Sequence, residues 1–451
     1  MSDSTKITSR EKLAYGLGDT ASNFFFHTFN LFLLYYYTDV IGLPAAAVGT
    51  MFLVTRLFDA FADPIMGLVA DRTNSRWGKF RPYLLWGALP YGVIGYAIFA
   101  NPQLSQNGKL VYAYATYTLM MLAYTVVNIP YSAMMGVMSA SSEERTSLSS
   151  YRFFCAFAGQ LAIGAMVLPL VKSLGHGNEA AGFARTIAIF AAVSVGMFLF
   201  TFWQTRERVS VTADTQASVR TDLGFLMRNR PWVILFFGAI LTLLNVSVRN
   251  GAVMFYFKYH VGNENGAPLF WTLGSIALIV GVASTNWLTR FIDKRRLLII
   301  LTWTNALTLA GFYFVDPHQS LVLHGLNVVS CLLAGPTPAI VWSMYADCAD
   351  YGEWRFGRRT TGLIFSASLF AVKVGITLGG ALGGWLLAAY GFVANTPQGP
   401  GALHGILLMF SLIPAGFAAL VGFAMMLYPI ENAQLEQIEA ELSVRRAAVP
   451  A

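Results

Sequence analysis

Apolar stretches, each bounded by polar residues or by glycine and proline, follow one another along almost the whole chain. A helix needs about 20 such residues to cross a bilayer. The pattern therefore predicts an all-α integral membrane protein with twelve transmembrane helices. They are expected near residues 13–37, 45–69, 82–100, 110–138, 150–171, 183–203, 232–257, 268–289, 297–315, 320–345, 361–390 and 403–428.

The longest polar interruption divides the twelve predicted helices into six and six. It runs from Thr205 to Arg230 and is charged and poor in aromatic residues, so it is the expected linker. Charged loops also recur at matching places in the halves, after the second and the eighth predicted helix. Two such halves are typical of the major facilitator fold, with its substrate site near the membrane midplane. The predicted parts are a six-helix half (1–204), a cytoplasmic middle loop (205–230), a second half (231–430) and a cytoplasmic tail (431–451).

Composition and charge agree with a membrane protein. Of the 451 residues, 56% are hydrophobic and 12% charged, which excludes a soluble globular domain. The net charge of +7 lies in short loops, so nucleic acid is not an expected partner. With the N-terminus inside, cytoplasmic segments hold 22 of the 30 lysines and arginines and external segments four. This bias predicts an inner (plasma) membrane protein with both termini in the cytoplasm.

Charged residues inside predicted spans are costly and are therefore candidates for a functional site. Asp59 and Asp63 are four residues apart, on one helix face, and Arg56 precedes them on that face. Two close carboxylates cannot both stay ionised without a cation, so this pair can bind a small cation or carry a proton. The other candidate charges are Arg152, Arg249 and Lys373.

A structural interpretation stands beside the functional one. Asp59 and Asp63 could pair with Arg56 and Lys373 only to hold the helix bundle together. Arg152 and Arg249 could each act in a gate or form a structural ion pair. Each could also lie at a helix end, with its side chain extending to water.

Sugar binding needs hydrogen-bonding amides or carboxylates and an aromatic face. Asn23 and His27 share one face of the first predicted helix, and Tyr124 and Asn128 lie in the fourth. The asparagines could instead join helices, and a lone histidine in a span is often structural.

The sequence offers no catalytic constellation, no phosphate-binding loop and no metal-ligand spacing, so no enzyme activity and no cofactor are expected.

Six motifs spread over nearly the whole chain point to one family. They are Tyr15-Gly16-Leu17-Gly18-Asp19, Tyr35 to Leu43, Arg56 to Gly67, Asp71 to Pro82, Asn128-Ile129-Pro130-Tyr131, and Asp350-Tyr351-Gly352-Glu353 with Gly357-Arg358-Arg359. Through them the chain resembles the glycoside-pentoside-hexuronide:cation symporters, which are major facilitators. The motif in the second predicted helix is the most specific of the six.

The resemblance implies a cation site and the identity of its cation. Asp59 and Asp63 match the paired cation-site aspartates of the family, and Thr125 matches a threonine that helps at that site. Ala62 lies where melibiose-type members supply an amide oxygen to sodium. Losing that oxygen favours H+ as the coupling cation, with Na+ or Li+ as alternatives; no other metal is expected.

The resemblance also implies a sugar site. Asn23, Asn128 and Ser132 stand where melibiose-type members have two sugar-binding aspartates and a tryptophan, which makes an α-galactoside doubtful. Arg152 and Lys373 match residues that line the sugar cavity. The chain looks more like the xyloside and pentoside carriers of the family. Those carriers share two motifs with it, Gly18-Asp19 and Val127 to Tyr131.

The expected function is secondary active uptake of a glycoside or pentoside, with a xyloside favoured, coupled to a cation. The expected partners are a small sugar and the lipid bilayer, and the functional unit is expected to be a monomer. Alternatives are a carrier of a hexuronide, galactoside or modified sugar, an exporter of a non-sugar amphiphile, and a receptor on a transporter fold. Four arginines are expected to serve gating or structure: Arg56, Arg249, Arg358 and Arg359.

Overall fold

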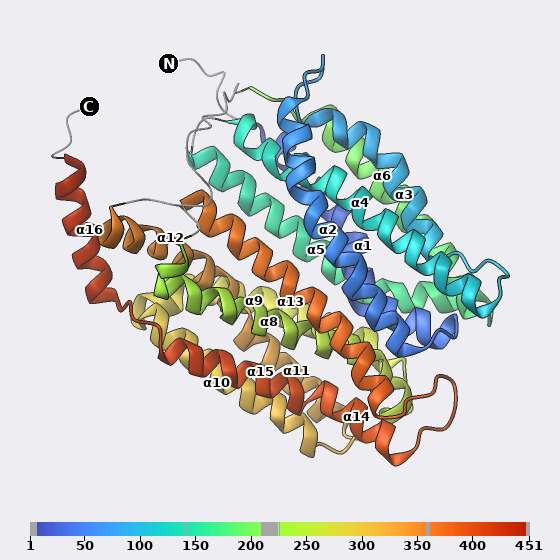
Figure 1. The fold of residues 1–451 in the computed structure, drawn as a ribbon. Coiled ribbons are helices and arrows are strands. Elements are labelled where there is room, and N and C mark those ends of the chain that lie inside the picture. The colour runs from blue at the N-terminus through green and yellow to red at the C-terminus, as the bar shows by residue number, and fades with distance from the viewer. Residues whose placement is uncertain (1–6, 140–141, 209–223, 225, 358–360, 448–451) are drawn as a thin grey trace. The chain divides into compact units, whose positions relative to one another are not determined.

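A computed structural model of the chain describes residues 7–139, 142–208, 224, 226–357 and 361–447, and this part is built of helices joined by short loops (Figure 1). The α-helices are α1 (Ser9–Thr28), α2 (Ala45–Arg72), α3 (Arg81–Phe99), α4 (Gln106–Met138), α5 (Ser142–Gly175), α6 (Glu179–Gln204), α8 (Arg230–Phe255), α9 (Gly266–Phe291), α10 (Lys294–Gly311), α11 (Ser320–Ala334), α12 (Pro336–Phe356), α13 (Thr361–Ala389), α14 (Pro400–Phe410), α15 (Leu412–Met426) and α16 (Asn432–Ala447). The π-helical segments are η2 (Phe29–Leu33), η3 (Tyr36–Val40) and η4 (Tyr256–Val261), and η5 (Phe312–Phe314) is a 3-10 turn.

The helices match the predicted spans. Within the described residues, ten helical stretches are long and apolar enough to cross a membrane. The other two predicted spans fall on α1 with its π-helical continuation and on α2. One predicted span covers α11 and part of α12, and another covers α14 and α15, which are separated at Ser411. The all-α membrane class is thus confirmed, whereas the count of twelve spans stays a prediction.

Several helices begin where a polar side chain satisfies a free backbone N–H group, as helix starts require. The side chain of Thr8 accepts from Glu11 N at α1, Ser105 accepts from Gly108 N at α4, and Asp293 accepts from two backbone N–H groups at α10. Because these capping residues lie in the loops, the sequence sets where the apolar helices start.

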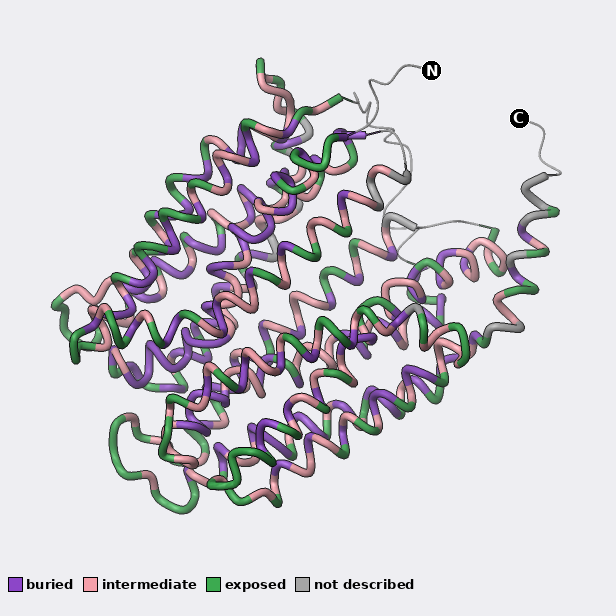
Figure 2. The backbone as a smooth tube through the Cα atoms, turned by 180° about the vertical axis from the view of Figure 1, so that it is seen from behind, coloured by how far each residue is buried: buried purple, intermediate pink, exposed green. Residues whose placement is uncertain are grey.

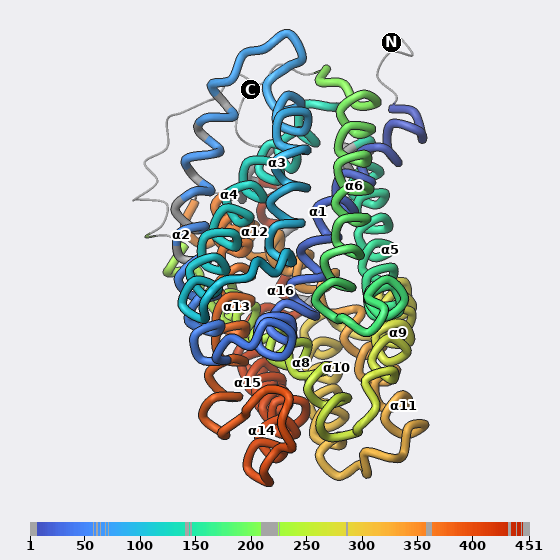
Figure 3. The backbone as a smooth tube through the Cα atoms, turned by 90° about the vertical axis from the view of Figure 1, so that its right-hand side faces the viewer, coloured from blue at the N-terminus to red at the C-terminus, as the bar shows by residue number. Residues whose placement is uncertain are grey.

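The chain divides into two compact units. Unit 1 comprises Met1–Ala213 with Glu264–Thr272 and Leu387–Gln398; unit 2 comprises Asp214–Asn263, Leu273–Leu386 and Gly399–Ala451. In unit 1, α1 packs against α5 and α6, α3 against α4 and α6, and α2 against α4 (Figure 3). In unit 2, α15 packs against α8 and α10. The middle-loop prediction (205–230) falls largely on residues outside the described part, and the predicted domain boundaries stay predictions.

The first long helix of each half ends in the same unusual way. α1 continues into the π-helical segments η2 and η3, and α8 continues into η4. Each run then reaches a glycine in the left-handed region, Gly42 at φ 81° and Gly262 at φ 75°. Since π-helix is rare and such φ values favour glycine, this agreement supports an internal repeat. The sequence prediction of one straight first span missed the two π-helical segments.

Glycines bring α13 close to α8 in unit 2. A Cβ atom at Gly375 would lie 2.7 Å from the carbonyl oxygen of Ile240, and one at Gly379 would lie 2.5 Å from Ser247 Cβ. Both positions therefore need glycine for helix packing within the molecule.

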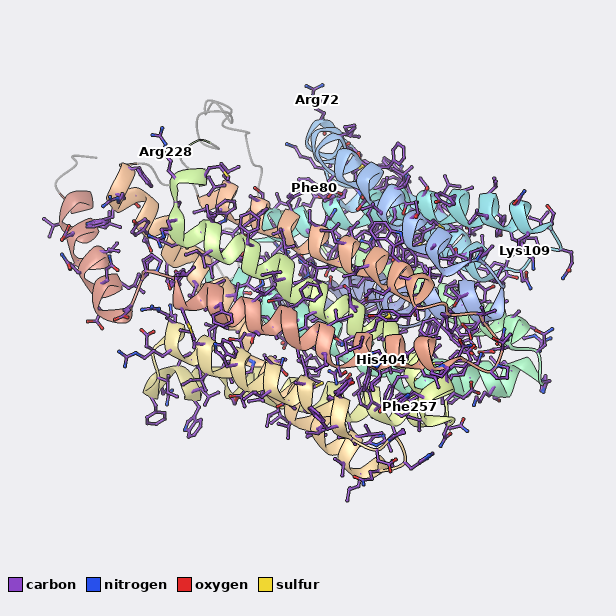
Figure 4. All side chains as sticks on the ribbon, turned by 60° about the horizontal axis from the view of Figure 1, so that its bottom comes forward. Arg72, Phe80, Lys109, Arg228, Phe257 and His404 are labelled. Carbon is purple, nitrogen blue, oxygen red and sulfur yellow. The ribbon has the colours of Figure 1, made fainter. Side chains whose placement is uncertain are left out.

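The helix ends carry much of the polar and exposed surface. In Figure 2 the exposed residues concentrate in the loops and recur along the helices between buried ones. In Figure 4, Arg72 projects from the end of α2, whereas Lys109 lies near the start of α4 at the other end of these helices. Arg228 precedes α8, and Phe257 lies in η4 beyond its far end. Charged loops thus bracket apolar helix interiors.

Candidate functional site

Three oxygen-bearing side chains converge between α2 and α4 in unit 1. The hydroxyl of Thr125 lies 2.7 Å from Asp59 Oδ1 and 3.0 Å from Asp63 Oδ1. Asp59 and Thr125 are buried, with 3% and 2% of their surface exposed, and Asp63 is half-buried. The four-residue spacing on α2 places both carboxylates on the face that meets Thr125. The structure therefore brings the three predicted cation-site residues together.

The Thr125 hydroxyl is shared by two carboxylates. A threonine hydroxyl has a single proton to donate, whereas two ionised carboxylates only accept. If one carboxyl is protonated, it can donate to Thr125 while Thr125 donates to the other carboxylate. A bound cation would balance the charge instead. The arrangement is thus suited to taking up one positive charge.

Arg56 lies one turn before Asp59 on α2 and is close enough to interact electrostatically with it. The guanidinium also interacts with Tyr117 of α4. This agrees with the structural interpretation as far as Asp59 is concerned, because the Arg56 charge partly offsets that carboxylate. A cation that binds here is attracted by Asp59 and Asp63 and repelled by Arg56.

A second charged cluster lies in unit 1 between α1, α4 and α5. Arg152 Nη2 is 3.2 Å from Asp19 Oδ1, and its guanidinium stands over the Tyr131 ring at 5.3 Å from the centroid. Tyr131 stacks on Tyr15 with centroids 4.7 Å apart and donates a 2.6 Å hydrogen bond to the Tyr15 carbonyl oxygen. Asp19 is buried and Arg152 half-buried, and the two stacked tyrosine rings hold the pair in place.

The Gly16-Leu17-Gly18-Asp19 motif explains how this cluster forms. A Cβ atom at Gly16 would lie 2.8 Å from the carbonyl oxygen of Tyr151 on α5. One at Gly18 would lie 2.7 Å from Tyr131 Cε2 on α4. Small residues allow helices to approach closely, and here they place Asp19 beside α4 and α5.

The remaining predicted sugar-site residues of unit 1 lie on α1 and α4 and are half-buried. Asn23 donates a 2.9 Å hydrogen bond to the Asp19 carbonyl oxygen. The side-chain oxygen of Asn128 is buried and receives no hydrogen bond from the described residues. Phe26 stacks with Tyr124 at 6.3 Å and contacts His27 edge-on at 5.6 Å. Ser132 lies one residue beyond Tyr131. The two amides thus lie on α1 and α4, the helices that also carry the stacked rings of Phe26 and Tyr124.

The predicted residues of unit 2 are cationic. Arg249 Nη2 donates a 3.1 Å hydrogen bond to Asn327, and its guanidinium lies over the rings of Phe312 and Phe410 at 4.9 and 5.5 Å. Lys373 is half-buried on α13, about 200° around the helix from Gly375 and so away from α8. The other two predicted gating residues, Arg358 and Arg359, fall outside the described residues.

Sequence reasoning missed Asp19 as a charge inside a span. It was treated only as part of the Gly18-Asp19 motif, although it lies one turn before Asn23 in an apolar stretch. The rule that intramembrane carboxylates are functional candidates would have selected it. Cys155, Cys331 and Cys348 are free thiols, and no group of metal-ligating side chains occurs among the residues that the structure describes.

Residues 14–432 match the family model described as "MFS/sugar transport protein". Three relatives are similar over almost their full lengths. The inner membrane symporter YicJ of Escherichia coli (strain K12) is 41% identical, with 91% of this chain and 89% of that protein covered. The putative glycoside/cation symporter YagG of the same strain is 39% identical, covering 98% and 97%. The isoprimeverose transporter of Lactiplantibacillus pentosus is 34% identical, covering 96% and 92%.

A solved structure agrees with the fold. A mutant of the nucleoside transporter NupG superposes with a TM-score of 0.67, covering 93% of this chain and 99% of that one. Its sequence is 15% identical, so the likeness concerns the fold alone.

Proposed function

Because the chain belongs to the MFS/sugar transport protein family, we propose that it is a secondary active symporter of a xyloside-type glycoside or pentoside. It takes up the sugar together with a cation, and this cation is a proton. The functional unit is a monomer of two six-helix halves, with both termini in the cytoplasm. The lysine and arginine bias of the loops supports this orientation.

The single observation that carries the coupling proposal is the shared hydroxyl of Thr125. It lies within hydrogen-bonding distance of both Asp59 and Asp63 in a buried place. One proton on the trio removes one of its two negative charges and lets Thr125 accept from one carboxyl group while it donates to the other. A sodium ion would need more oxygen ligands, and Ala62 offers no side-chain oxygen. The trio therefore supports H+ over Na+ or Li+.

The substrate proposal is supported by the neutral polar surface around α1 and α4. Asn23 and Asn128 supply amides, and Tyr124 supplies an aromatic ring for the apolar side of a sugar. His27, Ser132 and Arg152 are the other proposed sugar-binding residues of unit 1, and Lys373 is the one proposed from unit 2. One relative is named as an isoprimeverose transporter.

The proposed mechanism is alternating access. Protonation of the Asp59–Asp63 pair neutralises a charge that is costly inside the membrane, which favours sugar binding and permits the halves to rock. Linkage then requires that proton and sugar promote each other's binding by the same factor. Arg249, Arg358 and Arg359 serve gating or structure.

The test is uptake of a labelled β-xyloside into energised vesicles, with and without sodium, beside a galactoside and a glucuronide. The proposal predicts accumulation of the xyloside that does not depend on sodium and collapses when a protonophore removes the proton gradient. Accumulation of the glucuronide alone would contradict the substrate class. Strict sodium dependence would contradict proton coupling.

A further inference from the structure

The Asp19–Arg152 pair has hydrogen-bonding capacity beyond its own contact. A guanidinium presents five N–H donors and an ionised carboxylate about four acceptor positions. The pair is held by a contact of 3.2 Å between one nitrogen and one oxygen. The Arg152 side chain also interacts with Tyr15 and the Asp19 side chain with Asn23, and the donors and acceptors that remain are available to a ligand.

The Asp19–Arg152 pair is partly exposed. The Arg152 side chain is 25% exposed and the Asp19 side chain 10%. Charged side chains inside membrane spans almost always face the bundle interior or a water-filled cavity, so we take the exposed part of this pair to be within reach of a ligand. The surrounding rings of Tyr15 and Tyr131 fix the pair in place from α1 and α4.

A buried acceptor lies on the face of α4 that carries Tyr131. Asn128 Oδ1 receives no hydrogen bond from the described residues, and burying such a group unpaired costs about 1–3 kcal/mol. On α4, Asn128 shares one helix face with Tyr124 and Tyr131, four residues before and three after. Both tyrosines lie close enough to Asp19 and Arg152 to interact electrostatically with them. A ligand that brings hydroxyl donors here would satisfy Asn128.

We infer that Asp19, with Arg152 and Asn128, forms a subsite for adjacent hydroxyls of a neutral sugar ring, and that Asp19 determines which hydroxyl is required. This inference rests on the proposed sugar transport. A hydroxyl both donates and accepts, so one hydroxyl donates to Asp19 while accepting from Arg152. A neighbouring hydroxyl donates to Asn128.

The pair also explains why a neutral sugar suits this surface. Asp19 balances the charge of Arg152, so the subsite carries no net charge that a ligand must neutralise. A hydrogen bond to a charged group is stronger than a neutral one, and a ligand that lacks the hydroxyl leaves a desolvated charge unpaired. Asp19 therefore discriminates among sugars by their hydroxyl pattern.

The test measures binding of methyl β-xyloside and its 2-, 3- and 4-deoxy analogues to purified protein, for the wild type and Asp19→Asn. In the wild type, one deoxy analogue should bind about 30-fold more weakly than the parent. The loss of affinity that a deoxy analogue shows against the parent sugar in the same protein is called its penalty. In Asp19→Asn the parent sugar should bind about tenfold more weakly than it binds to the wild type, and the penalty at that one position should fall to about threefold. Penalties at the other positions should stay unchanged.

Two further variants separate recognition from folding. Asp19→Glu keeps the charge, and it should restore a penalty at the same position. Asp39→Asn changes an acid on the same helical run about 30 Å away, and it should leave all penalties unchanged. If Asp19→Asn keeps the full wild-type penalty at every position, the inference is overturned.

The outcomes also distinguish this inference from the proposed function. Cation-coupled uptake by the wild type with unchanged penalties in Asp19→Asn overturns the subsite alone. Position-specific binding without any cation-coupled uptake overturns the symport proposal and supports the subsite. If no xyloside binds to the wild type, both fall.

Discussion

The two units share their architecture but differ in the charges that they hold inside their helices. Unit 1 holds carboxylates, with Asp59 and Asp63 sharing Thr125, and Asp19 paired with Arg152. The predicted intramembrane charges of unit 2 are the cations Arg249 and Lys373. Arg249 is supported by an amide and by two aromatic rings.

This difference indicates where a cation can be coupled. An aromatic ring stabilises a cation by about 0.5–2 kcal/mol and changes no protonation state, so the Arg249 site is suited to a permanent charge. A pair of carboxylates can gain and lose a proton. The π-helical ends at Gly42 and Gly262 recur in the two units, so the two kinds of charge lie on similar helical frameworks.

The largest expected effect comes from removing a carboxylate of unit 1. Asp59→Cys removes one of the two carboxylates that accept from Thr125, so the trio loses its switchable charge. Accumulation of xyloside against a gradient should fall at least about 100-fold, while exchange of labelled for unlabelled sugar persists. Uptake and exchange in the same vesicles measure both. Full accumulation by the variant would show that the coupling charge lies elsewhere.

Effects of intermediate size are expected from replacing two glycines at helix contacts, one in each unit. Gly18→Ala in unit 1 forces the Tyr131 ring away from its place beneath Arg152, so sugar affinity should fall about tenfold. Gly379→Ala in unit 2 meets Ser247 and should lower stability by about 1–3 kcal/mol without changing affinity.

The matched control for both glycines is Gly196→Ala on α6, where an added Cβ meets nothing within 4 Å. Binding and thermal denaturation are measured for all three variants. An affinity loss in Gly379→Ala equal to that in Gly18→Ala would remove the distinction between the units.

The smallest effect concerns the loop end of unit 1. The Glu11 carboxylate accepts two 2.8 Å hydrogen bonds from Arg208, and these hold the pKa of the Arg208 guanidinium above its ordinary value. A raised pKa of a cation gives stability that is lost only as pH rises through the folded-state value. Since both values lie far above neutrality, Arg208 contributes no pH dependence between pH 6 and 8.

Glu11→Gln should therefore destabilise unit 1 by about 1 kcal/mol, because the Arg208 side chain is partly exposed. The midpoint of thermal unfolding should fall by the same amount at pH 6 and at pH 8. A loss of coupling in this variant would contradict the assignment of coupling to Asp59 and Asp63.

Much of the fold is readable from the sequence, because a bilayer requires long apolar helices that satisfy their own backbone groups. The structure confirms the all-α class, and the capping residues agree with the predicted loops. The π-helical segments η2, η3 and η4 were not predicted, because hydropathy does not distinguish a π-helix from an α-helix. The break at Ser411 was missed for the same reason.

The site was partly readable as well. The spacing of Asp59 and Asp63 predicts one shared face, and the family resemblance added Thr125, which lies between them in the structure. The contact between Asp19 and Arg152 joins residues 133 positions apart, so no local pattern could reveal it. It depends on how closely Gly16 and Gly18 let the helices approach.

The most direct test of the central claim, that the Asp59–Asp63–Thr125 trio carries a proton inward with the sugar, is a pH recording. A β-xyloside is added to lightly buffered, sodium-free, right-side-out vesicles while external pH is followed. The account predicts immediate alkalinisation of the medium, which is absent in Asp59→Cys at matched protein levels. Sugar entry without any pH change in the wild type, or equal alkalinisation by the variant, would contradict it.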